Sequence, residues 1–489
     1  MKFTMSLATA VACVTAVAAF AAPASASASD GDYAAYRTHF AKLANVQGGE
    51  APTPSIAEML ARERTHTYGV DMSTVAQRDP RLPRAQSWRD ECLKTKIEDT
   101  KVGEVKDRSH YCNHGRYFLS TLDTPDGKPG VVWFDWLVYG EGSVGGGSQR
   151  IIALHQELMN MRSDPDFPWP RHKVITASIG CDVQVPKGID PNKACQGTWF
   201  ATRTLSEWQS NPYANTKLWS DEKELADPKW EPQVGEEKVM MAAFQPKVTS
   251  IVPSLKPGPQ AKVDPPPDII NTVSVNGYAR FDSAKYLSTR QGAIFRGVVP
   301  HISYDPSKPR WKELAEHIRD ACDKDGNKNT YPPTTQAKDI PGCDIDHLIH
   351  RVAQSKVGWP KPQPGANSRH KERYRANSNA KDRACNASTP QTSTPGAKQC
   401  DEFPFASTYE GAARSEFPTS EFAGLKGTGI GNQFSVRKIN AQQNNWGGSD
   451  LSTWYSNDRI LDWATGGSSS TSASGLMRDG FWVRIGSVD

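Results

Sequence analysis

The sequence lacks several features that would place it at once in a common class of protein. Its 489 residues carry a formal net charge of only +4 at pH 7, which excludes a polycation that binds nucleic acid through its overall charge. Beyond the first 28 residues, no apolar run approaches the ~20 residues that a membrane-spanning helix needs. No segment repeats at a fixed period, which argues against solenoids and propellers. We therefore expect a polar, globular protein of two or three domains without a membrane span.

The most apolar stretch lies at the N-terminus and is typical of a secretory signal peptide. Lys2 supplies a positive start, Met5 to Phe20 form an apolar core, and small residues around Ala26 and Ala28 offer cleavage sites. The core is too short to span a membrane as a helix. We therefore expect residues 1–28 to be removed and the mature protein to be secreted.

Close Cys-x-x-Cys pairs, which are common in zinc sites, are also missing. Removal of the signal peptide with Cys13 leaves eight of the nine cysteines: Cys92, Cys112, Cys181, Cys195, Cys322, Cys343, Cys385 and Cys400. Successive pairs are separated by 20, 14, 21 and 15 positions, against 69, 127 and 42 between pairs. Eight cysteines allow 105 pairings, so the spacing favours four local disulfides without proving them. Zinc binding is the alternative.

Residues 29–245 are predicted to form a β-rich, sandwich-like domain. Residues 116–122 and 131–139 read as two strands, and Pro125-Asp126-Gly127 between them has the composition of a turn. Further strands are expected at 173–179, 198–205 and 238–244.

A proline-rich stretch at residues 246–270 is expected to be an extended linker, because proline disfavours the interior of helices and sheets. Residues 271–489 would then form an α+β domain. Trp311, Leu314, Ala315 and Ile318 recur at helical spacing after Pro309 and predict an amphipathic helix that ends at Cys322. Strands are expected at 272–281, 293–299 and 480–485, a short element at 346–351, and mostly loop at 355–399.

The run from Cys400 to Gly411 (CDEFPFASTYEG) concentrates the residues best suited to chemistry. Asp401, Glu402 and Glu410 lie among aromatic residues and proline, and acids in such a setting are costly unless they bind a cation, accept hydrogen bonds or stay protonated. One or two carboxylates and an amide suffice for Mg²⁺, which keeps several of its waters. If Asp401 and Glu402 lie on a strand, they point to opposite faces, so one could serve a metal and the other a proton transfer. The alternative is that these acids cap a turn or pair with arginines.

This run, followed by Gly427-Thr428-Gly429-Ile430-Gly431-Asn432-Gln433, resembles the signature of the NucA/NucB-type secreted deoxyribonucleases over roughly residues 270–489. The resemblance implies an α+β nuclease domain, with a ββα-metal-like site as one arrangement of it, that cleaves DNA without sequence specificity. It also implies a divalent metal ion, Mg²⁺ or Mn²⁺, and allows for a proteinaceous nuclease inhibitor as a partner. Ala412 departs from the pattern, where a second glycine is expected after Gly411.

Asn432 and Gln433 are candidates to bind the metal or the scissile phosphate, with Asn432 the candidate metal ligand beside Asp401 and Glu402. Alternatively, the two amides satisfy backbone groups in the glycine-rich loop. As a dinucleotide-binding fingerprint this loop fails, because no strand precedes it and its third glycine is misplaced.

A basic run from Arg351 to Arg383 precedes the acidic motif and is the candidate DNA-binding surface. The residues expected to steer phosphate are Arg369, Lys371, Arg373, Arg375, Lys381 and Arg383, with Trp359, His370 and Tyr374 available for stacking on bases. A solvated charged loop is the alternative reading.

A histidine base would have to come from outside the acidic run, from His317, His347, His350 or His370; a structural role is the alternative for each. A second function class is an exported polymer- or cell-wall-binding protein whose nuclease-like domain no longer cuts, which the aromatic residues between Val131 and Tyr139 suggest.

Overall fold

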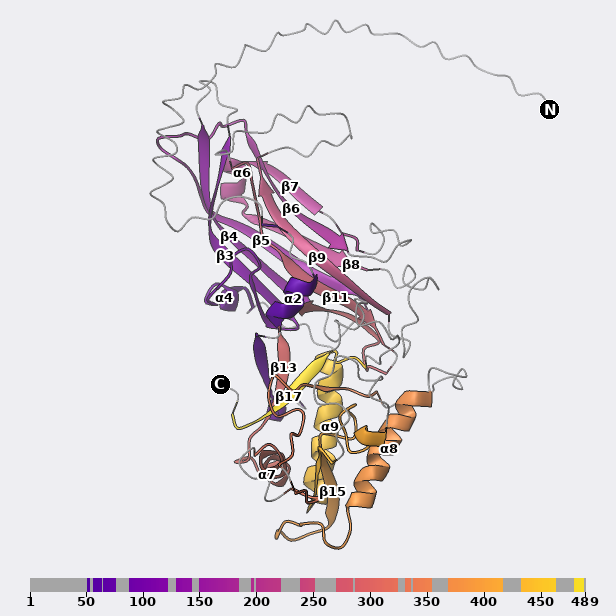
Figure 1. Cartoon of the computed structure of the whole chain (residues 1–489). Helices are drawn as coiled ribbons and strands as arrows, with labels where there is room; N and C mark the ends of the chain where they lie inside the picture. The colour runs from indigo at the N-terminus through magenta and orange to yellow at the C-terminus, as the bar shows by residue number, and fades with distance from the viewer. Residues whose placement is uncertain are drawn as a thin grey trace, which may run out of the picture.

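The structure is a computed structural model of the whole chain (Figure 1). It describes residues 51–52, 56–63, 65–75, 88–121, 129–142, 149–183, 195–197, 199–220, 238–250, 270–284, 286–323, 330–335, 337–353, 368–416, 432–462 and 479–487. The expected signal peptide and most of the expected linker lie outside these residues.

A β-rich domain occupies the upper part of the molecule in Figure 1. Its first sheet has the strand order β2-β3-β4-β5-β8. These strands are β2 (Glu104–Asp107), β3 (His110–Thr121), β4 (Gly130–Gly142), β5 (Ile151–Ser163) and β8 (Tyr213–Trp219). β3 and β4 pair in antiparallel register from His110↔Glu141 to Thr121↔Gly130, which confirms the predicted hairpin strands. The predicted turn lies outside the described residues.

The second sheet has the order β12-β11-β9-β6-β7, and β10 also pairs with β9. Its strands are β6 (Val174–Val183), β7 (Trp199–Thr204), β9 (Lys238–Thr249), β10 (Thr272–Ser274), β11 (Gly277–Ser283) and β12 (Gln291–Arg296). One hydrophobic core joins both sheets, with Trp136 and Leu154 from the first and Phe244 and Phe295 from the second. We call this unit, described residues 88–296, the β domain. It also holds α4 (Trp88–Cys92) and α6 (Leu205–Ser210), while α2 (Ile56–Glu63) packs against it through Met59.

The boundary between the domains differs from the one expected at residue 271. β10, β11 and β12 are strands of the β domain, so this domain extends to Arg296. Pro246, expected to start a linker, lies inside β9. The proline is tolerated because β9 changes partner along one of its edges. Phe244 pairs with β11 and Lys247 pairs with β10, so the backbone N–H that Pro246 lacks would lie between these two sets of hydrogen bonds.

The remaining described residues build a C-terminal domain around a four-stranded sheet of order β1-β13-β17-β14. The strands are β1 (Thr67–Asp71), β13 (Val299–Tyr304), β14 (Ile349–His350) and β17 (Gly480–Ile485). β1 and β17 both run parallel to β13, one on each side. β1 precedes the β domain in the chain and β13 follows it, so the β domain is an insertion within this sheet.

Helices and a two-stranded hairpin complete the C-terminal domain. They are α3 (Met72–Val75), α7 (Lys312–Ala321), α8 (Ser368–Ala384), β15 (Lys398–Phe403), a 3₁₀ turn η2 (Arg414–Glu416), β16 (Ser435–Asn440) and α9 (Ala441–Asn457). α7 confirms the predicted amphipathic helix. Among the described residues, no helix is both long and apolar enough to cross a membrane.

The expectation of mostly loop at residues 355–399 is wrong for α8. The buried side of this helix carries Arg373, Asn377 and Ala380 instead of large apolar residues. Because a hydrophobic stripe is the main sequence signal for a helix, a buried face of this composition gives almost none.

All four expected local disulfides are present: Cys92–Cys112, Cys181–Cys195, Cys322–Cys343 and Cys385–Cys400. The first two lie in the β domain and the last two in the C-terminal domain. None of these cysteines is therefore a zinc ligand in this structure.

A buried cluster of charges joins the two domains. The carboxylate of Asp479, directly before β17, forms ion pairs with Arg108 at 2.8 Å, Arg280 at 2.6 Å and Arg296 at 3.3 Å. Arg459, which follows α9, forms a second buried ion pair with Asp282 of β11. Burial alone would raise the pKa of Asp479, but the three guanidiniums and the backbone N–H of Leu461 hold it well below its usual range.

Candidate active site

The acidic motif lies on a hairpin that is followed directly by a helix. β15 pairs with β16 in antiparallel register, with Asp401 opposite Arg437 and Glu402 opposite Val436. Asn440 then caps α9, because its side chain accepts hydrogen bonds from the backbone N–H groups of Gln442 and Gln443. The order strand, strand, helix is thus continuous in the chain, and α9 packs beside β15 (Figure 1).

Asp401 is held by a buried histidine. His317 of α7 is fully buried, and its Nδ1 lies 2.6 Å from Oδ2 of Asp401. Its Nε2 lies 3.0 Å from the hydroxyl of Ser435 on β16. Because an ionised carboxylate can only accept, Nδ1 donates to Asp401, and in a neutral ring Nε2 accepts from Ser435. His317 therefore fixes one carboxylate oxygen of Asp401 and leaves Oδ1 for another ligand.

Glu402 points to the opposite face of β15, as alternation on a strand requires. It is 5% exposed, and neither carboxylate oxygen has a hydrogen-bond partner. Burial raises the pKa of Glu402 well above its usual range; nearby Lys381 opposes this, while Asp401 and Asp382 add to it. A carboxyl group in this state keeps its proton to a higher pH than an exposed glutamate does and can release it when a cation or base approaches.

Both acids line a cleft with a volume of about 950 Å³. One wall consists of α9, which turns Asn444, Gly448 and Ser452 toward the cleft. A Cβ added to Gly447 would lie 2.5 Å from Leu314 of α7, so this glycine lets α9 pack closely on its neighbour. Leu451 and Tyr455 of α9 also line the cleft, beside these smaller and polar residues.

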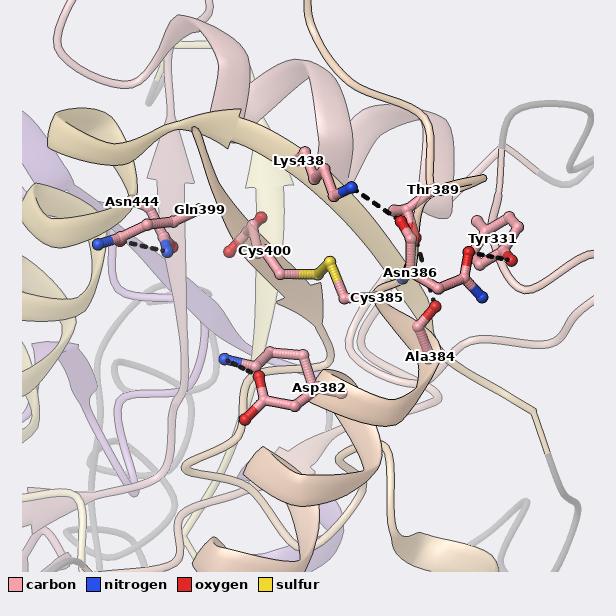
Figure 2. The surroundings of a disulfide bond; sticks show 12 residues. Tyr331, Asp382, Ala384, Cys385, Asn386, Thr389, Gln399, Cys400, Lys438 and Asn444 are labelled. Carbon is pink, nitrogen blue, oxygen red and sulfur yellow. Dashed lines mark hydrogen bonds and ion pairs between the residues drawn. A yellow bond between two sulfur atoms is a disulfide. The ribbon is translucent and has the colours of Figure 1, made fainter. Parts of the chain in front are cut away.

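The end of α9 nearest the acids is tied to β15. The Asn444 side chain donates to the Gln399 side chain at 3.2 Å, and Gln399 lies two positions before Asp401 on the same face (Figure 2). This contact places an amide of α9 on the Asp401 side of the hairpin.

The Cys385–Cys400 disulfide fixes the other side of the hairpin (Figure 2). It joins the end of α8 to the residue directly before Asp401. Beside it, Lys438 Nζ donates to the carbonyl of Asn386 at 2.8 Å, which ties β16 to the same turn. The carboxylates therefore stand on a strand that is held on both faces.

Of the remaining predicted catalytic residues, Glu410 is buried and engaged. Its oxygens accept from the backbone N–H of His350 at 2.8 Å and from His350 Nδ1 at 2.9 Å, so it positions β14 and does not line the cleft. Asn432 and Gln433 do not line the cleft either. Gln433 accepts from the backbone N–H of Asp339, and Asn432 has a positive φ of 64°, so the reading of these amides as turn residues fits the structure.

The predicted DNA-binding residues fall into different environments along α8. Lys381 lines the cleft. Arg375 is exposed, and Arg383 is exposed and paired with Glu416. Arg373 does not reach the surface: it is 2% exposed and lies 5.7 Å from the ring of Tyr409, so its expected role in DNA contact does not fit the structure. The side chains of Arg369 and Lys371 lie outside the described residues.

His347 and His350 pair with acids other than the two in the cleft. His347 pairs with Asp344 at 3.0 Å, and His350 pairs with Glu410. The side chain of His370 lies outside the described residues. His317 is the histidine that contacts Asp401, as a buried partner and not as an exposed base.

The donor set suits a hard divalent cation better than zinc. Among the described residues, no group of three or more His, Cys, Asp or Glu side chains gathers as a metal site. The cleft does combine carboxylates with the amides of Asn444 and Asn445, and oxygen donors of this kind with retained waters are what Mg²⁺ and Mn²⁺ accept. The residues present therefore fit a metal with few protein ligands.

The cleft residues that were not singled out from the sequence include Asn444, Asn445 and Arg290. Asn440 as a helix cap, followed by a polar helix start, is a signal that could have placed the two asparagines on a helix. Arg290 has no comparable signal, because it reaches the cleft from the β domain.

Comparison with known proteins gives one match. The model of the family described as deoxyribonuclease NucA/NucB matches residues 355–462, a segment narrower than the 270–489 expected from the sequence. It includes α8, β15, β16 and α9. No match was found among curated proteins or among solved structures. Residues 355–462 thus form a segment that resembles the NucA/NucB deoxyribonucleases and contains both acids of the cleft.

Proposed function

We propose that this protein is a secreted, metal-dependent endonuclease that hydrolyses DNA phosphodiester bonds without sequence specificity. The observation that carries the proposal is Glu402, a buried carboxyl group with no hydrogen-bond partner on either oxygen. Such a group is costly to keep in a fold unless it serves chemistry. It lies beside Asp401 in a cleft, within a segment that resembles deoxyribonucleases.

The two acids receive different roles because their surroundings differ. Asp401, held by His317, offers Oδ1 as an ionised oxygen and is the ligand we assign to a divalent ion, together with the amide of Asn444. Glu402, with its raised pKa, is the group we assign to proton transfer. A divalent ion bound there would stabilise charge on the phosphate and lower the pKa of a bound water.

A cation on the cleft wall would hold the substrate. Lys381 lines the cleft and is the cation we assign to phosphate. Arg351 also lines it, but it is 6% exposed and donates to the carbonyl of Ile460, and its guanidinium carbon lies 4.8 and 4.6 Å from the ring centres of Tyr286 and Tyr455. Positive groups of this kind contact phosphates, which every nucleotide carries. A cleft that holds its substrate through phosphates binds any sequence, which supports cleavage without sequence specificity.

Secretion is supported by the four disulfides, since such bonds persist in oxidising compartments. The alternative of a polymer-binding protein with exposed aromatics is not favoured. Trp133, Phe134 and Trp136 of β4 are at most 8% exposed and belong to the hydrophobic cores of the β domain.

The proposal is tested by incubating the full-length secreted protein with supercoiled plasmid and Mg²⁺ or Mn²⁺. Nicking that EDTA abolishes and added metal restores is expected. The absence of nicking with either metal, from folded protein, would overturn the proposal.

Asp401→Asn should lower the cleavage rate by at least ~100-fold, because the substitution removes the negative charge that holds a cation but keeps the size of the side chain. DNA binding should persist. A second readout is thermal: Mg²⁺ should raise the melting temperature of the wild type more than that of Asp401→Asn. Asp305→Asn, at a partly exposed acid that does not line the cleft, is the control and should match the wild type in both assays. Near-wild-type turnover of Asp401→Asn would move the chemistry away from β15.

A further inference from the structure

The cleft that contains the acids is not built by the nuclease-like segment alone. Its lining also includes Tyr286, Ser288 and Arg290, which lie in the loop between β11 and β12. These two strands belong to the second sheet of the β domain. One wall of the cleft therefore comes from a domain that lies outside the match to the deoxyribonucleases.

This loop is fixed by contacts with the C-terminal domain. The Tyr286 hydroxyl accepts from the backbone N–H of Asp462 at 2.6 Å. Arg459 donates to the carbonyl and the hydroxyl of Thr289, both at 2.9 Å. Leu287 packs in a small core with Leu461. These contacts fix the loop as part of the cleft wall.

The strand that follows the loop approaches Arg459 very closely. A Cβ added to Gly292 would lie 2.6 Å from the guanidinium of Arg459. The same guanidinium is committed to the buried ion pair with Asp282, so it cannot easily move aside. The glycine and the ion pair together hold the loop against the end of α9.

The loop and the acids lie toward opposite ends of the cleft. Asn444, near the start of α9, contacts β15, whereas the loop contacts residues 459–462, just beyond the end of α9. Asn444, Gly448, Ser452 and Ser456 line the cleft between them at four-residue steps, a stripe of ~18 Å at 1.5 Å per residue. That length matches roughly five nucleotides at the 3.4 Å rise of one strand of B-DNA.

We propose that the β domain is part of the substrate-binding surface and that Arg290 contacts a phosphate several nucleotides from the scissile bond. Arg290 is exposed at the cleft, and its guanidinium is a permanent cation suited to phosphate. The substrate is then an extended nucleic-acid strand that spans both domains. This inference rests on the proposed nuclease function and assigns the β domain a role in it.

The test compares Arg290→Gln with Arg171→Gln, an exposed arginine of the β domain that does not line the cleft. Binding of a labelled 20-base-pair duplex is measured in the Asp401→Asn background, over a range of salt concentrations. Arg290→Gln should weaken binding and reduce the slope of log K against log salt by about 0.9, the value for one lost phosphate contact. Arg171→Gln should leave both unchanged.

The second measurement is the cleavage rate of the Arg290→Gln protein without the Asp401→Asn substitution. The substrates are the duplex and the small diester bis(p-nitrophenyl) phosphate. Arg290→Gln should raise KM for the duplex by a larger factor than for the small diester, which is too short to reach Arg290. Unchanged duplex binding, or equal loss on both substrates, would overturn the role of Arg290. Failure of the wild type to cleave either substrate would instead count against the nuclease function itself.

Discussion

Two buried carboxyl groups in this molecule have opposite surroundings. Asp479, at the junction of the domains, faces three arginines and accepts a backbone hydrogen bond. Glu402, in the cleft, has no hydrogen-bond partner on either oxygen. The pKa of Asp479 is held below its usual range, whereas burial raises that of Glu402. The difference separates a carboxylate that joins parts of the fold from one that we propose to serve proton transfer.

The same comparison shows how the fold holds the strand that carries the unpartnered carboxyl group of Glu402. The cleft hairpin is braced by His317 on one face and by the Cys385–Cys400 disulfide on the other, and the junction fixes the cleft wall that the β domain supplies. An unpartnered buried group persists only when its surroundings are rigid enough to prevent relaxation around it. Each of the following predictions replaces one of these groups: the junction carboxylate, the disulfide or the cleft carboxyl group.

Asp479→Asn should have the largest effect on stability. Removing one charge from a buried ion cluster leaves its partners uncompensated and typically costs 3–5 kcal/mol. Urea unfolding of the full chain at pH 7 measures it. Because the pKa of Asp479 is lowered in the folded state, its contribution is present above the usual carboxyl pKa and declines as the pH falls below it. The exposed Asp90→Asn, whose carboxylate pairs with Arg89, should cost less than about 1 kcal/mol. Equal costs for the two variants would contradict the structural role of Asp479.

Removal of a disulfide should separate stability from activity. The Cys385–Cys400 and Cys181–Cys195 bonds span 15 and 14 positions, so chain entropy predicts a similar loss of about 3 kcal/mol for replacing either pair with alanine. Only the first pair is adjacent to Asp401, so only its removal should also lower the cleavage rate at a temperature where both variants are folded. Parallel urea titrations and nicking assays give the two values. Full activity without the Cys385–Cys400 bond would show that the hairpin does not need this support.

Glu402→Gln should stabilise the protein slightly while it lowers cleavage. Between the usual carboxyl pKa and the raised value, the folded state keeps a proton that the unfolded state has released, so stability falls as the pH rises. Glutamine carries no charge and removes this dependence. At pH 8 the free energy of unfolding of the variant should therefore exceed that of the wild type by on the order of 1 kcal/mol. This difference in stability should disappear near pH 4.

Glu410→Gln is the matched control, since Glu410 is equally buried but accepts two hydrogen bonds from His350. It should destabilise the protein, because the amide nitrogen would face a donor. A loss of stability in Glu402→Gln at pH 8 would mean that Glu402 is satisfied by a partner in solution.

The parts of the structure that follow local rules could be predicted from the sequence. The hairpin strands β3 and β4, helix α7, strand β17 and the four disulfides were expected from alternation, helical spacing and cysteine distances. The acidic residues were found because eleven residues of mixed type formed a recognisable run. These signals are contained within short windows of the chain.

What could not be predicted depends on contacts between distant segments. The pairing of β1 with β13 joins residues more than two hundred positions apart, and nothing in either strand specifies it. The contact of His317 with Asp401 requires α7 to pack on β15, and the sequence offered four histidines of equal merit. Asn432 and Gln433 follow a glycine-rich loop that suggested a role at the site, but they do not line the cleft. Asn444, which the sequence did not single out, lines the cleft from α9.

The insertion of the β domain within the C-terminal sheet has a consequence for biosynthesis. β17 pairs with β13 on one side and with β14 on the other, so the sheet that supports the acids stays incomplete until residue 485 has been made. A ribosome-bound or partly exported chain would therefore carry the β domain in full but no finished cleft. For the nuclease proposed above, this order of assembly would delay activity until translation is nearly complete.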